Sequence, residues 1–149
     1  MRQISLIFFF LLVTGCGNIY VVEEVIAVDQ IRVEGGEIFR YIGVKAPAKE
    51  NYYYEKSMEL HRKLLSQKKI RVEKDAGIPN GYYVFVKDLE NPAKDTLVNA
   101  ELLLFGRAWL NEDDMNLYSK SQKQNYLDQI EHAQKVAKEN KEGVWEREP

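Results

Sequence analysis

Short strand-like segments separated by turn signals are the feature that most constrains how this chain can fold. β-Branched residues dominate Tyr20–Val28, and a short alternating piece follows at Ile31–Val33. The glycine pair Gly35-Gly36 is a strong turn signal, and it precedes a third apolar segment at Ile38–Val44. The pattern therefore predicts three consecutive β-strands early in the chain.

The rest of the chain predicts two more strands and three helices. The strands are expected at Ile70–Glu73 and at Tyr82–Val86, which follows an Asn80-Gly81 turn signal. Three sets of residues at helical spacing predict the helices: Tyr54, Met58, His61 and Leu65; Val98, Leu102 and Phe105; Leu127, Ile130, Gln134 and Ala137. This order predicts an α+β fold, a five-stranded β-barrel of the oligonucleotide/oligosaccharide-binding (OB) type with three α-helices.

Composition excludes several classes of function. A length of 149 residues suits one domain, and no linker divides residues 20–145. The 21 Lys and Arg residues against 23 Asp and Glu residues argue against a strongly basic nucleic-acid binder. One cysteine excludes an intramolecular disulfide and a multi-cysteine metal site, and two histidines leave little room for a histidine-rich metal centre.

The N-terminus predicts export and a lipid anchor. Arg2 precedes a ten-residue apolar run, Ile4–Val13, which is too short to span a bilayer but suits a signal peptide. The run ends in Val-Thr-Gly-Cys, which resembles the lipobox of bacterial lipoproteins, with Cys16 as the acylated residue. A plain secretory signal with an incidental cysteine is the alternative. We therefore expect a signal peptide over 1–15, a lipidated tether over 16–22 and a folded domain over 23–146. The expected location is the bacterial cell envelope, and Gly17 favours the outer membrane where one exists.

Several motifs follow one another in a defined order and spacing: Val28–Val33, Phe39–Pro47, Leu97–Leu103, Phe105–Ala108 and Ala133–Trp145. By these motifs the chain resembles the staphylococcal nuclease (thermonuclease) family from about Val25 to Trp145. The resemblance implies calcium-dependent hydrolysis of DNA and RNA phosphodiester bonds. In that chemistry two carboxylates hold the cation, a third acts on water, and two arginines stabilise the charge that builds on the phosphate.

Only two of these functional positions are retained. By resemblance, Asp29 matches a calcium-binding aspartate and Arg40 matches the first phosphate-binding arginine. Lys45 replaces the second calcium-binding aspartate, Ala48 replaces the glutamate proposed as general base, and Pro79 lies nearest the place of the second arginine. A lysine repels a cation and an alanine cannot accept a proton, so we expect no calcium cofactor and no nuclease activity.

The resulting hypothesis is a membrane-anchored binding or structural module of the cell envelope, held by Cys16. We expect Asp29 and Lys45 to form an ion pair where calcium would bind. The alternative is a calcium-dependent endonuclease with a site rebuilt from Asp29, Glu50 and Arg40. A third hypothesis is an envelope protein that contacts a glycan or another lipoprotein through the barrel mouth. Nucleic acid is possible as a partner but is not favoured.

Other side chains favour structural roles. We expect His61 in the core and His132 at the surface. Of the three tyrosines Tyr52–Tyr54, we expect Tyr54 in the core and the other two exposed, with a stacking platform as the alternative. The run Glu112–Asp114 lacks a calcium-loop pattern and predicts a solvated acidic loop. In addition, Trp109 and Trp145 are expected to hold the terminal helix against the barrel.

Overall fold

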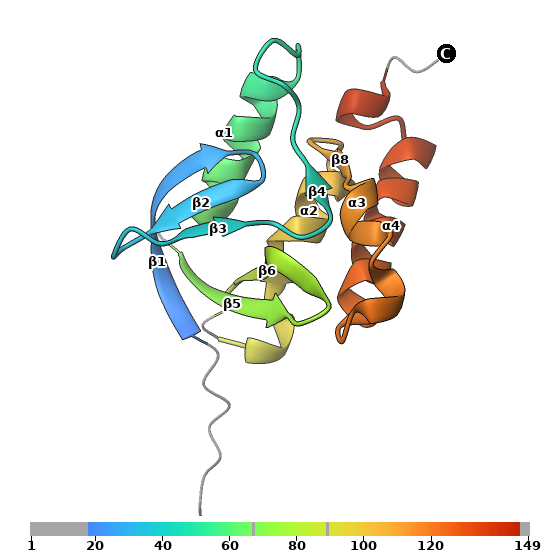
Figure 1. Ribbon diagram of the computed structural model, residues 1–149. Helices are drawn as coiled ribbons and strands as arrows, with labels where there is room; N and C mark the ends of the chain where they lie inside the picture. The colour runs from blue at the N-terminus through green and yellow to red at the C-terminus, as the bar shows by residue number, and fades with distance from the viewer. Residues whose placement is uncertain (1–17, 67, 89, 147–149) are drawn as a thin grey trace, which may run out of the picture.

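A computed structural model describes residues 18–66, 68–88 and 90–146 of the chain. Within these ranges the strands, helices and 3₁₀ turns follow one another closely (Figure 1). They are β1 (Asn18–Ala27), β2 (Gln30–Val33), β3 (Ile38–Arg40), β4 (Val44–Lys45), α1 (Tyr54–Leu65), β5 (Lys69–Asp75), β6 (Ile78–Val86), η1 (Pro92–Lys94), β7 (Thr96–Leu97), α2 (Val98–Leu104), β8 (Trp109–Leu110), α3 (Glu112–Met115), η2 (Tyr118–Lys120), α4 (Gln124–Glu139) and η3 (Gly143–Trp145).

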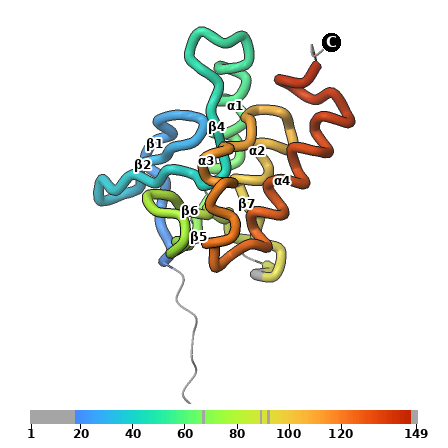
Figure 2. Tube along the Cα trace, turned by 45° about the vertical axis from the view of Figure 1, so that its right-hand side comes forward, coloured from blue at the N-terminus to red at the C-terminus, as the bar shows by residue number. Residues whose placement is uncertain are grey.

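The predicted α+β class is confirmed, with a strand arrangement that differs in detail. A six-stranded antiparallel sheet has the order β3-β2-β1-β5-β6-β7, and β4 and β8 form a separate pair. Figures 1 and 2 place β1 on one side of the molecule and α4 on the other. The helix α2 packs between them, because it contacts both β6 and α4.

The sheet does not close into a continuous barrel. The third predicted strand, Ile38–Val44, divides into β3 and β4, and Tyr41, directly after β3, forms a single isolated parallel bridge with Tyr82 of β6. The division falls near Gly43, whose φ is 77°. The Gly43 N–H bonds to a carboxylate rather than to a neighbouring strand. The strand therefore breaks at Gly43, because neither its backbone conformation nor its N–H partner belongs to the sheet.

The side chain of Asn99, on α2, joins the two strand edges at the gap. Its amide donates to the carbonyl of Ile42 over 2.9 Å and to that of Tyr82 over 3.0 Å, and its oxygen accepts from the Val84 N–H over 2.9 Å. Asn99 is fully buried. A buried backbone group without a partner costs about 1–3 kcal/mol, so this side chain satisfies groups that a closed sheet would pair with backbone.

Two apolar clusters form the interior. The larger fills the space between the curved sheet, α1 and α2, and includes Ile31, Phe39, Ile70 and Leu102. The smaller one joins the end of α4 to the segment before α1, and consists of Tyr53, Ala137, Val144 and Trp145 with Trp109 packed against it. The two indoles thus hold the C-terminal helix in place, as expected. Among the described residues, no helix is long and apolar enough to cross a membrane.

The ordered fold begins earlier than we expected. Residues 18–22, which we assigned to a tether, belong to β1: Asn18–Val21 pairs with β5, and Val22 pairs with Val33 of β2. Their β-branched side chains suit a strand, and the Tyr20 ring packs edge-on against Phe39 with centroids 5.0 Å apart. The expected signal peptide and Cys16 lie outside the described residues.

Two further local expectations are corrected. The Asn80-Gly81 pair does not precede β6 but lies within it, as a bulge between the Lys74–Tyr82 and Asp75–Ile78 pairs, with Asn80 at a φ of 61°. Among the three tyrosines, Tyr53 rather than Tyr54 is buried, because it enters the smaller cluster. Tyr52 remains 62% exposed, as expected.

Candidate functional site

Arg40, the retained phosphate-binding candidate, ends β3 and already donates four hydrogen bonds within the protein. Its two terminal nitrogens bind both carboxylate oxygens of Asp114, over 3.0 and 3.1 Å. Its Nε donates to the carbonyl of Asn80 over 3.0 Å, and Nη1 also donates to the carbonyl of Tyr41 over 3.3 Å. An arginine has five N–H donors, so these four bonds leave little capacity for a phosphate.

Asp114 is the anion that occupies this arginine. It lies on α3, and its side chain is only 8% exposed, against 28% for that of Arg40. The same carboxylate accepts the N–H of Gly43 over 2.7 Å, so it joins α3 to both β3 and β4. The expectation of a solvated acidic loop is therefore wrong for this residue, although Glu112 and Asp113 are exposed. Burial is possible because the charge is paired and hydrogen-bonded.

Asn111 holds α3 in the position that Asp114 requires. As the N-cap, its side-chain oxygen accepts from the N–H groups of Asp113 and Asp114, over 3.0 and 3.3 Å. Replacing Asn111 with alanine is expected to lower the free energy of unfolding by about 1 kcal/mol, measured by urea denaturation. Asn116→Ala, at the exposed other end of the helix, is the matched control and should change it by less than about 0.5 kcal/mol. Equal losses in the two variants would contradict a capping role.

Asp29, the retained metal-binding candidate, lies in the tight turn between β1 and β2. Its carbonyl accepts the N–H of Tyr41 over 2.8 Å, which holds the turn against the chain just after β3. Burial raises the pKa of its carboxyl group, while its own backbone N–H and the nearby Arg40 charge oppose that rise. Within the described ranges, Asp29 forms no ion pair with Lys45, so that expectation is wrong.

Lys45 instead lines a groove on another face. It is exposed on β4, directly opposite Trp109 of β8, and side chains at opposite positions of an antiparallel pair share a face. The groove encloses about 390 Å³ and is also lined by Lys138 and Trp145. Ala48 and Glu50 are exposed in the segment that follows β4. Among the described residues, Glu50 forms no ion pair with Arg40, which is paired with Asp114 instead.

The model of the staphylococcal nuclease homologue family matches residues 38–147. The chain belongs to the staphylococcal nuclease family. No curated protein matches it. The matched range runs from β3 to η3 and so covers most of the described elements.

The donor set of this family member does not fit a calcium ion. Calcium takes six to eight oxygen ligands, usually with several carboxylates. Asp29 supplies one carboxylate, and the resemblance implies Lys45 and Ala48 at the positions of the second aspartate and the glutamate. In the part of the chain that the structure describes, no three His, Cys, Asp or Glu side chains could share a metal ion. We therefore derive no catalytic step through calcium.

His61 is a buried structural histidine, as predicted. Its Nδ1–H donates to the carbonyl of Ala27 over 3.0 Å, and its Nε2 accepts from the Tyr41 hydroxyl over 2.8 Å. Both residues are fully buried. Burial lowers the pKa of His61 to about 4, with the Ala27 bond opposing that change, and burial raises the pKa of Tyr41. The pair fastens α1 to the segment after β3 and is neutral at physiological pH.

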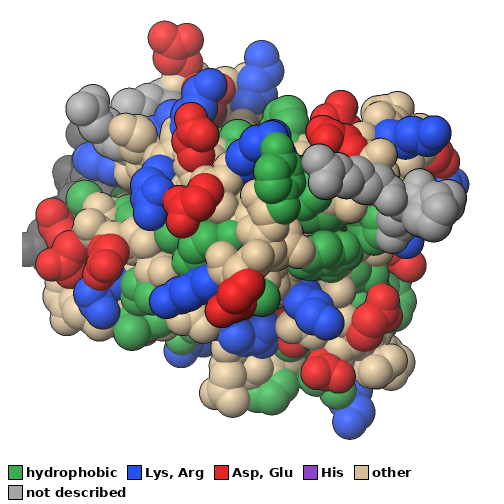
Figure 3. Space-filling view, turned by 90° about the horizontal axis from the view of Figure 1, so that it is seen from above, with side chains coloured by type: hydrophobic (Ala, Val, Ile, Leu, Met, Phe, Trp, Pro, Cys, Tyr) green, Lys and Arg blue, Asp and Glu red, His purple; other side chains and the backbone are tan. Residues whose placement is uncertain are grey.

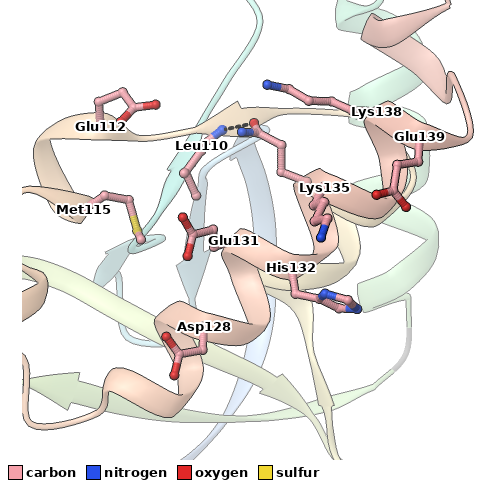
Figure 4. Close-up of a pocket in the computed structure, with 10 residues that line it drawn as sticks. Leu110, Glu112, Met115, Asp128, Glu131, His132, Lys135, Lys138 and Glu139 are labelled. Atoms are coloured by element: carbon pink, nitrogen blue, oxygen red, sulfur yellow. Dashed lines mark hydrogen bonds between the residues drawn. The ribbon is translucent and has the colours of Figure 1, made fainter.

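A second groove lies between α4 and the β8–α3 segment and encloses about 700 Å³ (Figure 4). Met115 and Glu131 point toward each other across it, and His132 lies on its α4 side, exposed as predicted. Charges of both signs line it. Figure 3, which looks at the end opposite the start of β1, likewise shows basic and acidic side chains interspersed. Neither view shows the continuous basic surface that a non-specific nucleic-acid binder requires.

Sequence reasoning missed Asp114, and a weak signal could have found it. Asn111 precedes three acidic residues, and an asparagine N-cap followed by carboxylates is a helix-start pattern. A four-residue helix shows no apolar periodicity, so nothing indicated which of the three carboxylates turns inward. The partner, Arg40, lies 74 residues away in the sequence.

Proposed function

We propose that this staphylococcal nuclease family member is a lipid-anchored module of the bacterial cell envelope that binds or supports a partner without hydrolysing phosphodiester bonds. The family fold is retained, and acylated Cys16 is the anchor. The proposal assigns no calcium cofactor. It also treats Arg40 as a structural residue rather than as a phosphate ligand.

The observation that carries the proposal is the occupation of Arg40 by Asp114. Stabilisation of a phosphoryl transition state depends on donors that are free to meet the developing charge. Here two terminal nitrogens of Arg40 are bound to a carboxylate that is almost fully shielded from solvent. A nucleic-acid phosphate would have to displace this internal anion and leave it buried and unpaired, which is costly.

The neighbouring substitutions support the same conclusion. Lys45 places a positive charge where a metal ligand is needed, and Ala48 has no group that could orient or deprotonate water. Loss of one electrostatic donor alone costs about 10²–10³ in rate. The loss of a ligand, a base and one arginine together is expected to leave no measurable hydrolysis by the family mechanism.

A cleavage assay tests this proposal with the fragment 17–149, which contains every described element. The fragment is incubated with single-stranded DNA, double-stranded DNA and RNA, in the presence of calcium, magnesium or a chelator. We expect no cleavage and no calcium-dependent change in melting temperature. The Lys45→Asp/Ala48→Glu variant is assayed beside it, to show whether restored carboxylates bring back calcium binding.

Cleavage by the unmodified fragment that a chelator stops would overturn the proposal. Loss of that cleavage in Glu50→Gln, an exposed position, would then identify the rebuilt site of the alternative hypothesis. The anchor is tested separately with the full chain. The unmodified protein should partition into the detergent phase, and Cys16→Ser should remain in the aqueous phase; equal partition of the two would contradict the anchor.

A further inference from the structure

We propose that the outer face of β1 at its N-terminal end rests on the bilayer, so that this end of the domain meets the membrane. We define this strand-start face by Ile19, Val21 and Lys69. The inference rests on the lipid anchor of the proposed function and adds the surface and orientation with which the domain meets the membrane.

The apolar part of this face has no cover in the described structure. Alternation along β1 turns Tyr20 inward, where it packs on Phe39, and turns Ile19 and Val21 outward. Ile19 is 55% exposed and Val21 is 43% exposed. Two large aliphatic side chains two residues apart on one strand face form a small apolar surface in contact with water, and its burial is favourable.

The anchor lies next to this face in the sequence. One residue separates Cys16 from Asn18, the first residue of β1. A residue spans at most about 3.6 Å, so the backbone of Asn18 lies within about 7 Å of that of Cys16. The polar headgroup region on each side of a bilayer is about 5–7 Å thick. No long tether lifts the domain away, and β1 therefore begins at the level of the headgroups.

Charge at the face is consistent with this orientation. Lys69 lies opposite Val21 in the β1–β5 pair, so the two side chains share this face. In the described ranges Lys69 has no ion pair, whereas Arg71, which lies opposite Ile19, is paired with Asp95. A lysine can lay its apolar stem beside buried side chains and keep its ammonium among anionic headgroups.

One acidic residue lies at the anchor end of the face. Glu73 is two residues beyond Arg71, which is opposite Ile19, and its carboxylate is paired with Arg71 and Lys123. It therefore presents no unpaired negative charge to the membrane.

Two other acidic residues lie toward the other end of the face. Glu23 follows Val21 along β1, and the N–H of Glu34 bonds to the Val21 carbonyl over 3.0 Å. Both side chains are exposed, and both residues are farther from the anchor than Ile19. The charges of the whole surface nearly cancel. We therefore attribute the contact chiefly to the anchor and the two aliphatic side chains.

A label at residue 21 tests the orientation, because acylation of Cys16 consumes the only natural thiol. Val21→Cys in the full lipidated chain is labelled with an environment-sensitive fluorophore. The protein is then reconstituted into vesicles of phosphatidylethanolamine and phosphatidylglycerol. The matched control is Phe105→Cys, also 43% exposed, next to Gly106, which bonds to Val144 of η3. Figures 1 and 2 place η3 at the opposite end from the start of β1.

We expect aqueous iodide to quench the residue 21 label at least about threefold less than the residue 105 label in vesicles. Headgroup spin labels should quench residue 21 alone, and the two labels should be equally accessible in the soluble fragment 17–149. Equal iodide access in protein that floats with the vesicles would overturn the orientation while leaving the anchor intact. If the residue 21 label were also protected from iodide in the soluble fragment, a second copy of the chain rather than the membrane would cover this face. If the lipidated protein did not float with the vesicles, both the proposed anchor and the proposed orientation would be overturned.

Discussion

Replacing Asp114 with alanine is expected to lower the free energy of unfolding by about 2–3 kcal/mol. Breaking a buried ion pair from one side costs about 3–5 kcal/mol, because the remaining charge stays buried without a partner. The cost is smaller here because Arg40 is 28% exposed and keeps its bonds to two carbonyls. The Gly43 N–H also loses its acceptor. Urea denaturation of the fragment 17–149 measures the change.

Two controls separate the pair from a general effect of the substitution. Asp113→Ala removes the adjacent, exposed carboxylate and should change stability by less than about 0.5 kcal/mol. A double-mutant cycle with Arg40→Ala should give a coupling energy above about 1 kcal/mol between residues 40 and 114. A coupling near zero would show that the pair is not an energetic unit. Inorganic phosphate should stabilise Asp114→Ala more than the unmodified fragment, since the variant frees two donors of Arg40.

Much of the fold could be predicted because strands and helices have different apolar periods. The strand signals at Tyr20–Val28 and Ile31–Val33 and the three helical patterns all correspond to elements of the structure. The turn before β6 was misplaced, because Asn80-Gly81 has the stronger local signal. The chain turns instead at Ala76-Gly77, where a Cβ on Gly77 would lie 1.9 Å from the Lys120 carbonyl oxygen. Tertiary packing, which no local pattern contains, decides between the two turns.

The sequence predicts which residue types occupy the candidate site, but not which side chains they contact. By resemblance, Lys45 and Ala48 replace family residues, whereas the partners of Asp29 and Arg40 cannot be inferred from the sequence. Asp29 and Lys45 have opposite charges, yet β4 turns Lys45 toward Trp109. Arg40 finds its anion on a helix too short to predict. Charge complementarity in a sequence therefore indicates candidates for pairing, and strand register and helix placement choose among them.

Stability is expected to fall by about 2–3 kcal/mol through His61 alone when the pH is lowered from about 7 to about 4.5. The imidazole has a pKa of about 4 in the folded protein, against 6.5 in the unfolded chain. Between these values the unfolded state binds a proton that the folded state does not, so stability decreases as the pH falls through this window. Below about pH 4 both states are protonated and the loss is complete. Urea denaturation at several pH values measures the dependence.

The comparison of two histidine variants isolates this contribution from the carboxyl groups that titrate in the same range. His61→Gln should remove about 2–3 kcal/mol of the pH dependence, whatever its effect on stability at neutral pH. His132→Gln, at an exposed position, should leave the dependence unchanged. Nuclear magnetic resonance of the unmodified protein gives a direct measurement. A His61 ring that titrates above pH 6 in the folded state would mean that its bonds to Tyr41 and Ala27 do not keep it neutral and buried.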